Sequence, residues 1–289
     1  MWFPFFFFVS GVFYKHKTTK ILFFEKFSGL IKPVLFTVIF YNLFFFDKWL
    51  EIYKDLYGIF QFPLYALWFM PTLLCTIILG SVIIRSFIND IRTLAVIAVF
   101  LALLSSKGTT LIFEVDNFKV INSRLPFTLE SLIFTIPVFM CGVYFREYVL
   151  HFKPSLLNFF YCFLIIVFFV KKLGILINVG SFIYAPYFPS LVCSLLSIYM
   201  VLCLSQYLSK MPYISYLLCF CGKNSLYITL FHWVLLFWFG VFLNKPDLSN
   251  IPMLTKDWII YIATVIFSLL VKVLFSNFKI TRWMFAIKK

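Results

Sequence analysis

The sequence predicts an all-α fold, a polytopic bundle of transmembrane helices, and two observations carry this prediction. Of the 289 residues, 63% are hydrophobic and only 12% are charged, with a mean hydropathy of +1.00. A soluble domain of this length cannot hide so much apolar surface, so lipid must solvate most of it. The apolar residues also fall into runs close to membrane length, separated by short basic connections.

Nine membrane segments account for the apolar runs. The first covers residues 1–13 and has neither the charged start nor the cleavage site of a secretory signal peptide. It is shorter than the ~20 residues that cross a bilayer. We therefore expect one more helix upstream, ten in all, so that the single domain 1–289 is incomplete at its N-terminus. The other eight segments lie at 30–46, 64–84, 91–106, 127–145, 156–170, 182–204, 224–243 and 258–275.

The charges of the connections predict the orientation. Alternate connections carry sixteen Lys and Arg residues against three acids, whereas the other set carries nine against seven. The positive-inside rule places the more basic set, and the C-terminus with it, in the cytoplasm. The membrane also explains the net charge of +14, so no nucleic-acid partner is expected. The basic set comprises 15–32, 85–92, 146–153, 210–223 and the tail from 272.

The seven cysteines give no sign of a metal site. All lie in or beside apolar segments, and Cys219 and Cys221 have no matching Cys or His pair. No Gly-rich phosphate loop or Ser-centred nucleophile motif is present either. We therefore expect inert thiols and no metal cofactor.

The densest polar cluster within an apolar run is Gly222-Lys-Asn-Ser-Leu-Tyr-Ile-Thr-Leu-Phe-His232. On one helix, Ser225, Thr229 and His232 share a face, and His232 lies ~13 Å along the axis from Lys223, near the bilayer centre. An ionisable group at that depth usually faces a cavity or a partner, and His can act as a general base. A contact in which these side chains hydrogen-bond between helices explains the spacing equally well.

Other polar residues have a structural and a functional interpretation. Glu130, in the first turn of its segment, is favoured by the helix dipole, or it lies at the outer mouth of a cavity. An aromatic belt at the outer interface explains Trp68 without any function. The five lysines from Lys15 to Lys32 set the topology, or they form a cytoplasmic patch for acidic lipid or a phosphate-bearing cofactor.

Four segments, in order along the chain, resemble the acyltransferase-3 family of bacterial integral membrane O-acetyltransferases, especially its fucose 4-O-acetylase-like branch. The last of the four is the most specific, because it repeats the family's Gly-Lys-Asn-Ser-Leu-Tyr-Ile string and its His. Trp2 stands where the family often has His, and Ser28 or Gly29 replaces an expected basic residue. The four are Phe3-Pro-Phe-Phe-Phe-Phe-Val-Ser-Gly11, Leu67-Trp-Phe-Met-Pro71, Ile136-Pro-Val-Phe-Met-Cys-Gly-Val-Tyr144 and the segment from Gly222 to His232.

The resemblance implies an enzyme of the bacterial inner membrane. It would move an acyl group, usually acetyl, from cytoplasmic acetyl-CoA to a hydroxyl of a cell-surface glycan or its lipid-linked precursor. It implies that His232 is catalytic, that the main catalytic His lies in the expected upstream helix, and that Lys26 and Lys32 face the donor. The residues assigned to the substrate and acyl path are Asn224, Ser225, Thr229, Glu130 and Trp68.

Two other functions are compatible with the sequence. The chain could be a non-catalytic remnant of the family, without the helix that carries the main His. It could also be a transporter or flippase for a glycan intermediate, although such proteins often have repeated halves and no internal repeat is visible.

Overall fold

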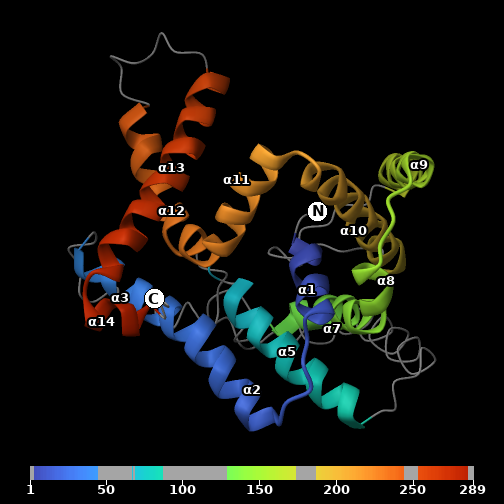
Figure 1. Cartoon of the computed structure of the whole chain (residues 1–289), viewed down its shortest axis with the longest axis horizontal. Coiled ribbons are helices and arrows are strands. Elements are labelled where there is room, and N and C mark those ends of the chain that lie inside the picture. The colour runs from blue at the N-terminus through green and yellow to red at the C-terminus, as the bar shows by residue number, and fades with distance from the viewer. Residues whose placement is uncertain are drawn as a thin grey trace, which may run out of the picture. The chain divides into compact units, whose positions relative to one another are not determined.

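The described part of the chain is helical. The computed structural model describes residues 3–44, 67, 69–86, 129–173, 187–243 and 253–285, which contain no strand, so the all-α prediction is confirmed there (Figure 1). The helices are α1 (Phe3–Val12), α2 (Thr19–Lys26), the π-helix η1 (Phe27–Ile31), α3 (Lys32–Phe44), α5 (Phe69–Ser86), α7 (Leu129–Tyr144), α8 (Arg146–Leu150), α9 (Leu156–Leu173), α10 (Tyr187–Ser209), α11 (Pro212–Lys223), α12 (Ser225–Leu243), α13 (Met253–Ser276) and α14 (Lys279–Met284).

The predicted segments agree with these helices. Helix α1 lies within the first segment, and α3, α5, α7, α9, α10, α12 and α13 occupy seven of the eight that follow. The ends differ by a few residues, as at α13, which begins at Met253 instead of residue 258. The segment predicted at 91–106 lies outside the described residues.

Helix α11 corrects the prediction, because residues 212–223 were expected to lie in a connection. Pro212 at the first helical position and Lys223 in the last turn are ordinary start and stop signals. The chain then bends by 64° between Pro212–Lys223 and Ser225–His232. The predicted distance of ~13 Å from Lys223 to His232 along a single axis is therefore wrong.

Two of the described helices are long and apolar enough to cross a membrane, namely Tyr187–Ser209 and Thr255–Ser276. The bent pair Pro212–Lys223 and Ser225–His232 makes a third if it counts as one broken span. These helices indicate a membrane protein. Nine membrane segments and a cytoplasmic C-terminus remain predictions.

The chain divides into two compact units. The first unit contains the described residues of Met1–Phe24 and Pro71–Ser215. At its centre α1 lies against α7 (Figure 1), where a Cβ atom on Gly142 would overlap the Phe8 carbonyl oxygen and one on Gly11 would overlap the Phe139 carbonyl. Only glycine allows the two backbones to approach so closely. Two of the family-like segments therefore meet at their glycines.

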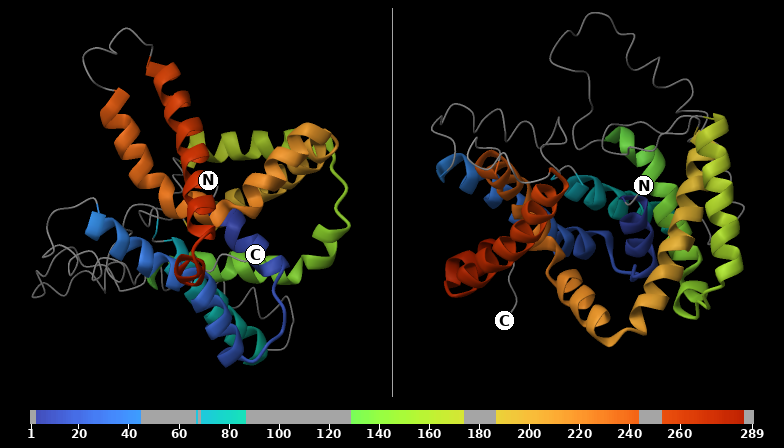
Figure 2. Two further views of the ribbon diagram at one scale, coloured as in Figure 1. Left: turned by 60° about the vertical axis from the view of Figure 1, so that its left-hand side comes forward. Right: turned by 90° about the horizontal axis from the view of Figure 1, so that it is seen from above.

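Aromatic rings and hydroxyl groups complete the core of the first unit. Phe139 is fully buried, and a Cβ atom on Gly80 of α5 would lie 2.7 Å from its ring. The hydroxyls of Thr76 and Thr135 are 2.7 Å apart, and Tyr187 donates a hydrogen bond to the Ile133 carbonyl. Helices α9 and α10 run side by side at the edge of the unit (Figure 2).

The second unit contains the described residues of Glu25–Ile59, Pro63–Met70 and Tyr216–Lys289. Helices α12 and α13 form an antiparallel pair, since Phe239 contacts Phe267 and Phe231 contacts Phe275 (Figure 2). After α13 the chain turns back, and Phe285 packs on the rings of Phe231 and Phe275 at 5.8 and 4.8 Å. This aromatic cluster fixes α14 against the end of the helix pair.

Candidate functional site

Asn224 is the junction between α11 and α12. Its side chain is 5% exposed, and its Nδ2 donates a hydrogen bond of 2.7 Å to the Phe220 carbonyl at the end of α11. Its own carbonyl accepts the first backbone bonds of α12, from Tyr227 at 3.0 Å and Ile228 at 3.2 Å. Asn224 therefore ends one helix, begins the next and fixes the bend between them.

Lys272 of α13 reaches the same asparagine. Its Nζ donates a hydrogen bond of 2.5 Å to Asn224 Oδ1 and lies 5.3 Å from the centre of the Tyr227 ring. The lysine is half-buried, and no carboxylate in the described part of the chain pairs with it. A neutral amide and an aromatic face thus hold a positive charge, and the described residues leave its other two N–H donors without an acceptor.

His232 lies two turns along α12 from Asn224 and is half-buried. Its Nδ1 is 2.7 Å from the carbonyl oxygen of Thr229. Because a carbonyl can only accept, Nδ1 must carry the hydrogen, and in the neutral ring the lone pair is on Nε2. The bond to Thr229 therefore prepares Nε2 to accept a proton.

The other predicted residues of α12 have different environments. Ser225, Thr229 and His232 belong to one helix, as the spacing predicts. Thr229 is half-buried, whereas Ser225 is exposed at the start of the helix. The structure thus brings Asn224 together with Lys272, and Thr229 with His232. In the described structure no hydrogen bond joins the Ser225 side chain to either pair.

The remaining predicted site residues lie elsewhere. Lys26 ends α2, and Lys32 begins α3 with its Nζ 4.5 Å from the centre of the Trp283 ring. Both lysines are half-buried. Glu130 belongs to the first turn of α7, but its side chain lies outside the described part of the structure, as does Trp68.

The polar residues of α13 are not among the predicted site residues. The sequence places Lys272 only among the basic charges of the cytoplasmic tail. The structure buries Thr264 and Ser268, which precede Lys272 at intervals of four residues and so share its helix face. Their hydroxyls have no hydrogen-bond partner among the described residues. The interval of four residues between these polar side chains is visible in the sequence, and inside an apolar segment it indicates a polar helix face.

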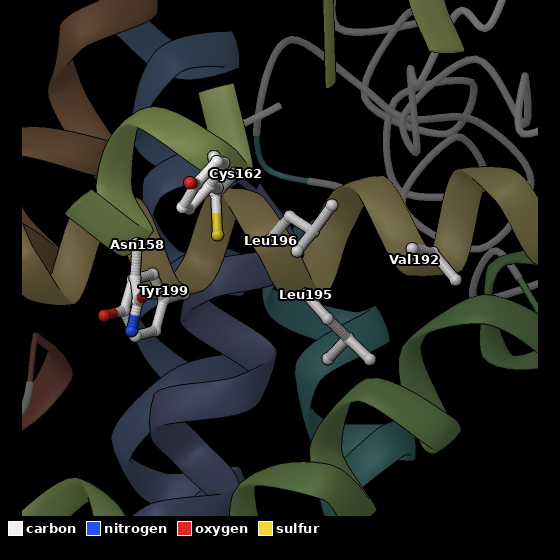
Figure 3. Close-up of a pocket in the computed structure, with 7 residues that line it drawn as sticks. Asn158, Cys162, Val192, Leu195, Leu196 and Tyr199 are labelled. Carbon is white, nitrogen blue, oxygen red and sulfur yellow. The ribbon is translucent and has the colours of Figure 1, made fainter. Parts of the chain in front are cut away.

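The first unit contains a groove whose lining residues are distant in the sequence from Asn224, His232 and Lys272. It measures about 500 Å³ and runs between α9 and α10, with Asn158 and Tyr199 at one end and Val192 at the other (Figure 3). Its remaining wall is mainly apolar, and none of the predicted site residues lines it. No His, Asp, Glu or Lys is among the residues that line this groove.

No group of three or more His, Cys, Asp or Glu side chains is gathered within the described residues. The absence of a metal cofactor therefore stays a prediction. What the second unit does offer is a histidine with a basic nitrogen and a lysine held by a buried amide. These two features belong to one helix pair and suit proton transfer and anion binding.

Comparison with known proteins identifies the family. The family model for an acyltransferase domain, acyltransferase-3, matches residues 1–277 and so extends over both units. No curated protein and no solved structure matches the chain. The matched region contains all four family-like segments and the pair of α12 and α13. The chain therefore belongs to the acyltransferase-3 family and is a membrane acyltransferase.

Proposed function

We propose that this protein is an O-acyltransferase of the bacterial inner membrane. It transfers an acetyl group from cytoplasmic acetyl-CoA to a hydroxyl of a cell-surface glycan or of its lipid-linked precursor. Family membership supports acyl transfer in general, and the four family-like segments support the finer assignment. The observation that carries the proposal is the geometry of His232, whose Nδ1 is occupied by the Thr229 carbonyl while Nε2 keeps a lone pair.

The reaction requires a base and a route for one proton. The acceptor hydroxyl oxygen attacks the thioester carbon, a C–O bond forms, the C–S bond breaks, and the proton of the hydroxyl must leave. His232 Nε2 accepts this proton and returns it to the departing sulfur, so that the ring ends as it began. Asn224 fixes the bend from which α12, and with it His232, begins.

The other residues form the surroundings of this chemistry. In the proposal Asn224, Ser225, Thr229, Glu130 and Trp68 line the substrate and acyl path. Lys26 and Lys32 are on the donor side, where the C-terminus also lies. Membrane lipids surround the helices, no metal takes part, and no nucleic acid is bound.

The test is the acetyl content of surface glycans. A strain that lacks this gene should lose acetyl groups from one glycan, and a plasmid carrying the wild-type gene should restore them. Mass spectrometry of the released polysaccharides measures both. An acetyl content that stays the same in every glycan would contradict the proposal, and intact folding with no transfer from acetyl-CoA would favour a non-catalytic remnant.

One structural observation favours a second candidate, a transporter for a glycan intermediate. Broken helices occur at the substrate sites of transporters, and the chain bends by 64° between α11 and α12. A transporter should move the lipid-linked sugar across vesicles that contain the purified protein but no acyl-CoA. An acyltransferase should show no flux under those conditions and should transfer acetyl when the donor is added.

A further inference from the structure

The corner between α13 and α14 holds positive charges that the described residues leave unpaired. The Thr281 hydroxyl donates a hydrogen bond of 2.5 Å to the Phe275 carbonyl, and the rings of Phe275 and Phe285 are 4.8 Å apart. These contacts fix α14 against the last turn of α13, one turn beyond Lys272. Arg282 belongs to the folded-back helix, so both cations are part of one corner.

Neither cation has an anionic partner in the described structure. Among the described residues, Lys272 binds the neutral amide of Asn224 and the face of Tyr227 and no other group. The Nε of Arg282 is buried and has no hydrogen-bond acceptor among the described residues. Helices α3, α11, α12 and α14 contain no Asp or Glu, and Asp257 lies ~22 Å away from Lys272 along α13.

A role in membrane topology alone does not explain this arrangement. Charges that only set orientation can stay in water, as Lys279 does on the same corner, where it is exposed. Lys272 and Arg282 are instead half-buried, and neither has an anionic partner in the described structure. A cation held partly out of water without a counter-charge is unfavourable, and an anion from outside the chain that reaches the exposed part of both side chains would supply that charge.

We propose that Lys272 and Arg282 bind a phosphoryl group. The guanidinium fork matches two phosphate oxygens, and the ammonium group adds a point charge with two free donors. Lys32 adds a third cation against α14, because its Nζ lies 4.5 Å from the centre of the Trp283 ring. The phosphate belongs either to coenzyme A, an identity that rests on the proposed function, or to an anionic lipid headgroup.

The experiment measures phosphate binding separately from acyl transfer. The purified full-length chain is titrated calorimetrically with coenzyme A and with adenosine 3′,5′-bisphosphate in a neutral detergent. In parallel, phosphatidylglycerol is titrated into nanodiscs of phosphatidylcholine that contain the protein. The variants are Lys272→Gln and Arg282→Gln, and the matched control is Lys279→Gln, which removes an exposed charge from the same corner.

We expect Lys272→Gln and Arg282→Gln each to weaken binding about tenfold, with about twofold or less for Lys279→Gln. Loss of nucleotide binding identifies coenzyme A as the source, and loss of phosphatidylglycerol binding alone identifies a lipid headgroup. Arg282→Gln keeps the test decisive if Lys272→Gln misfolds, because the Arg282 Nε has no partner in the described structure to lose. The proposal is overturned if Arg282→Gln leaves both affinities unchanged, or if Lys279→Gln weakens them equally.

The same samples separate this inference from the proposed function. Transfer of acetyl from acetyl-CoA to a glycan acceptor is measured on the wild-type protein. Phosphate binding that depends on Arg282, without any acyl transfer, means that the site exists and the proposed function is wrong. If acyl transfer occurs but neither Lys272→Gln nor Arg282→Gln changes the phosphate affinities, the proposed function stands and the phosphate site is wrong.

Discussion

The two units each contain a close helix pair, and the two pairs are built on different principles. In the first unit α1 meets α7 through Gly11 and Gly142, with no charged side chain among the described residues around these two glycines. In the second unit α12 meets α13 through aromatic rings and through the hydrogen bond from Lys272 to Asn224. The first contact depends on the close approach of two backbones. The second includes a polar pair in which Lys272 uses one of its three N–H donors on Asn224.

This difference shows where chemistry can take place. Helix association in lipid gains little from the hydrophobic effect, so small residues that allow close packing are sufficient to join two helices. A lysine in an apolar helix adds nothing that such packing requires and is expensive to keep there. The predictions below test whether Lys272, in the last turns of α13, serves a function or only the packing of the second pair.

The largest effect should come from adding a methyl group to the glycine contact. In Gly142→Ala the new Cβ overlaps the Phe8 carbonyl, which is backbone and cannot rotate away, so α1 and α7 must separate. We expect the unfolding free energy to fall by about 3 kcal/mol. Thermal unfolding of the detergent-solubilised protein, followed by circular dichroism, measures this change.

Gly29→Ala is the matched control for the glycine contact. A Cβ atom at Gly29 has no neighbour within 4 Å, so the unfolding temperature should stay the same or rise slightly. Equal destabilisation by the two substitutions would mean that the close approach of α1 and α7 does not hold the first unit together.

Removal of the proposed base in the second unit should affect the reaction and not the fold. We expect His232→Ala to lower the rate of acyl transfer about 100-fold, the usual contribution of a general base, with membrane insertion unchanged. Radiolabelled acetyl transfer from acetyl-CoA to the glycan acceptor gives the rate.

His151 provides a matched comparison for His232. Its Nδ1 is also bonded to a backbone carbonyl, that of Glu147 at 3.0 Å, but the residue is exposed in the turn after α8. His151→Ala should therefore leave the rate unchanged. Equal losses in both variants would remove the special role of His232.

The sequence predicts much of the fold because lipid imposes a simple rule. A run of apolar residues near membrane length must be helical, and α10 and α12 lie where such runs occur. Helix α11 was missed for the same reason. Lys210 and Lys223 made its segment resemble a connection, although a helix can satisfy its own backbone whether or not it spans the bilayer.

The site was predictable only in part. Hydropathy and spacing indicate His232, and family resemblance indicates Asn224. Both are predictable because they belong to one continuous segment, from Gly222 to His232. The partner of Asn224 is 48 residues further along the chain. Nothing in a single sequence specifies which residue of α13 faces α12, so the pairing with Lys272 required the structure.

The hydrogen bond between Lys272 and Asn224 can be measured by a double-mutant cycle. Asn224→Ala leaves a half-buried ammonium group without its acceptor, and we expect a loss of about 2 kcal/mol in unfolding free energy. In the Lys272→Met background the same change should cost clearly less, because no charge remains to be satisfied. Additive effects of the two substitutions would show that the pair contributes no stability of its own.

The smallest effect concerns the hydroxyl pair of the first unit. Thr76 uses its one hydroxyl hydrogen on the Thr72 carbonyl, so Thr135 must be the donor in the contact of 2.7 Å between the two threonines. Thr135→Val removes that donor while keeping its volume, and we expect a loss of about 1 kcal/mol.

Ser10→Ala is the reference for this pair, because Ser10 bonds the Phe6 carbonyl of its own helix and should cost little. The cost of Thr135→Val should lie between that of Ser10→Ala and that of Asn224→Ala. If Thr135→Val cost as much as Asn224→Ala, a neutral hydroxyl pair would be worth as much as a charged one. Lys272 would then need no functional explanation, and the contrast between the two helix pairs would reduce to ordinary hydrogen bonding in lipid.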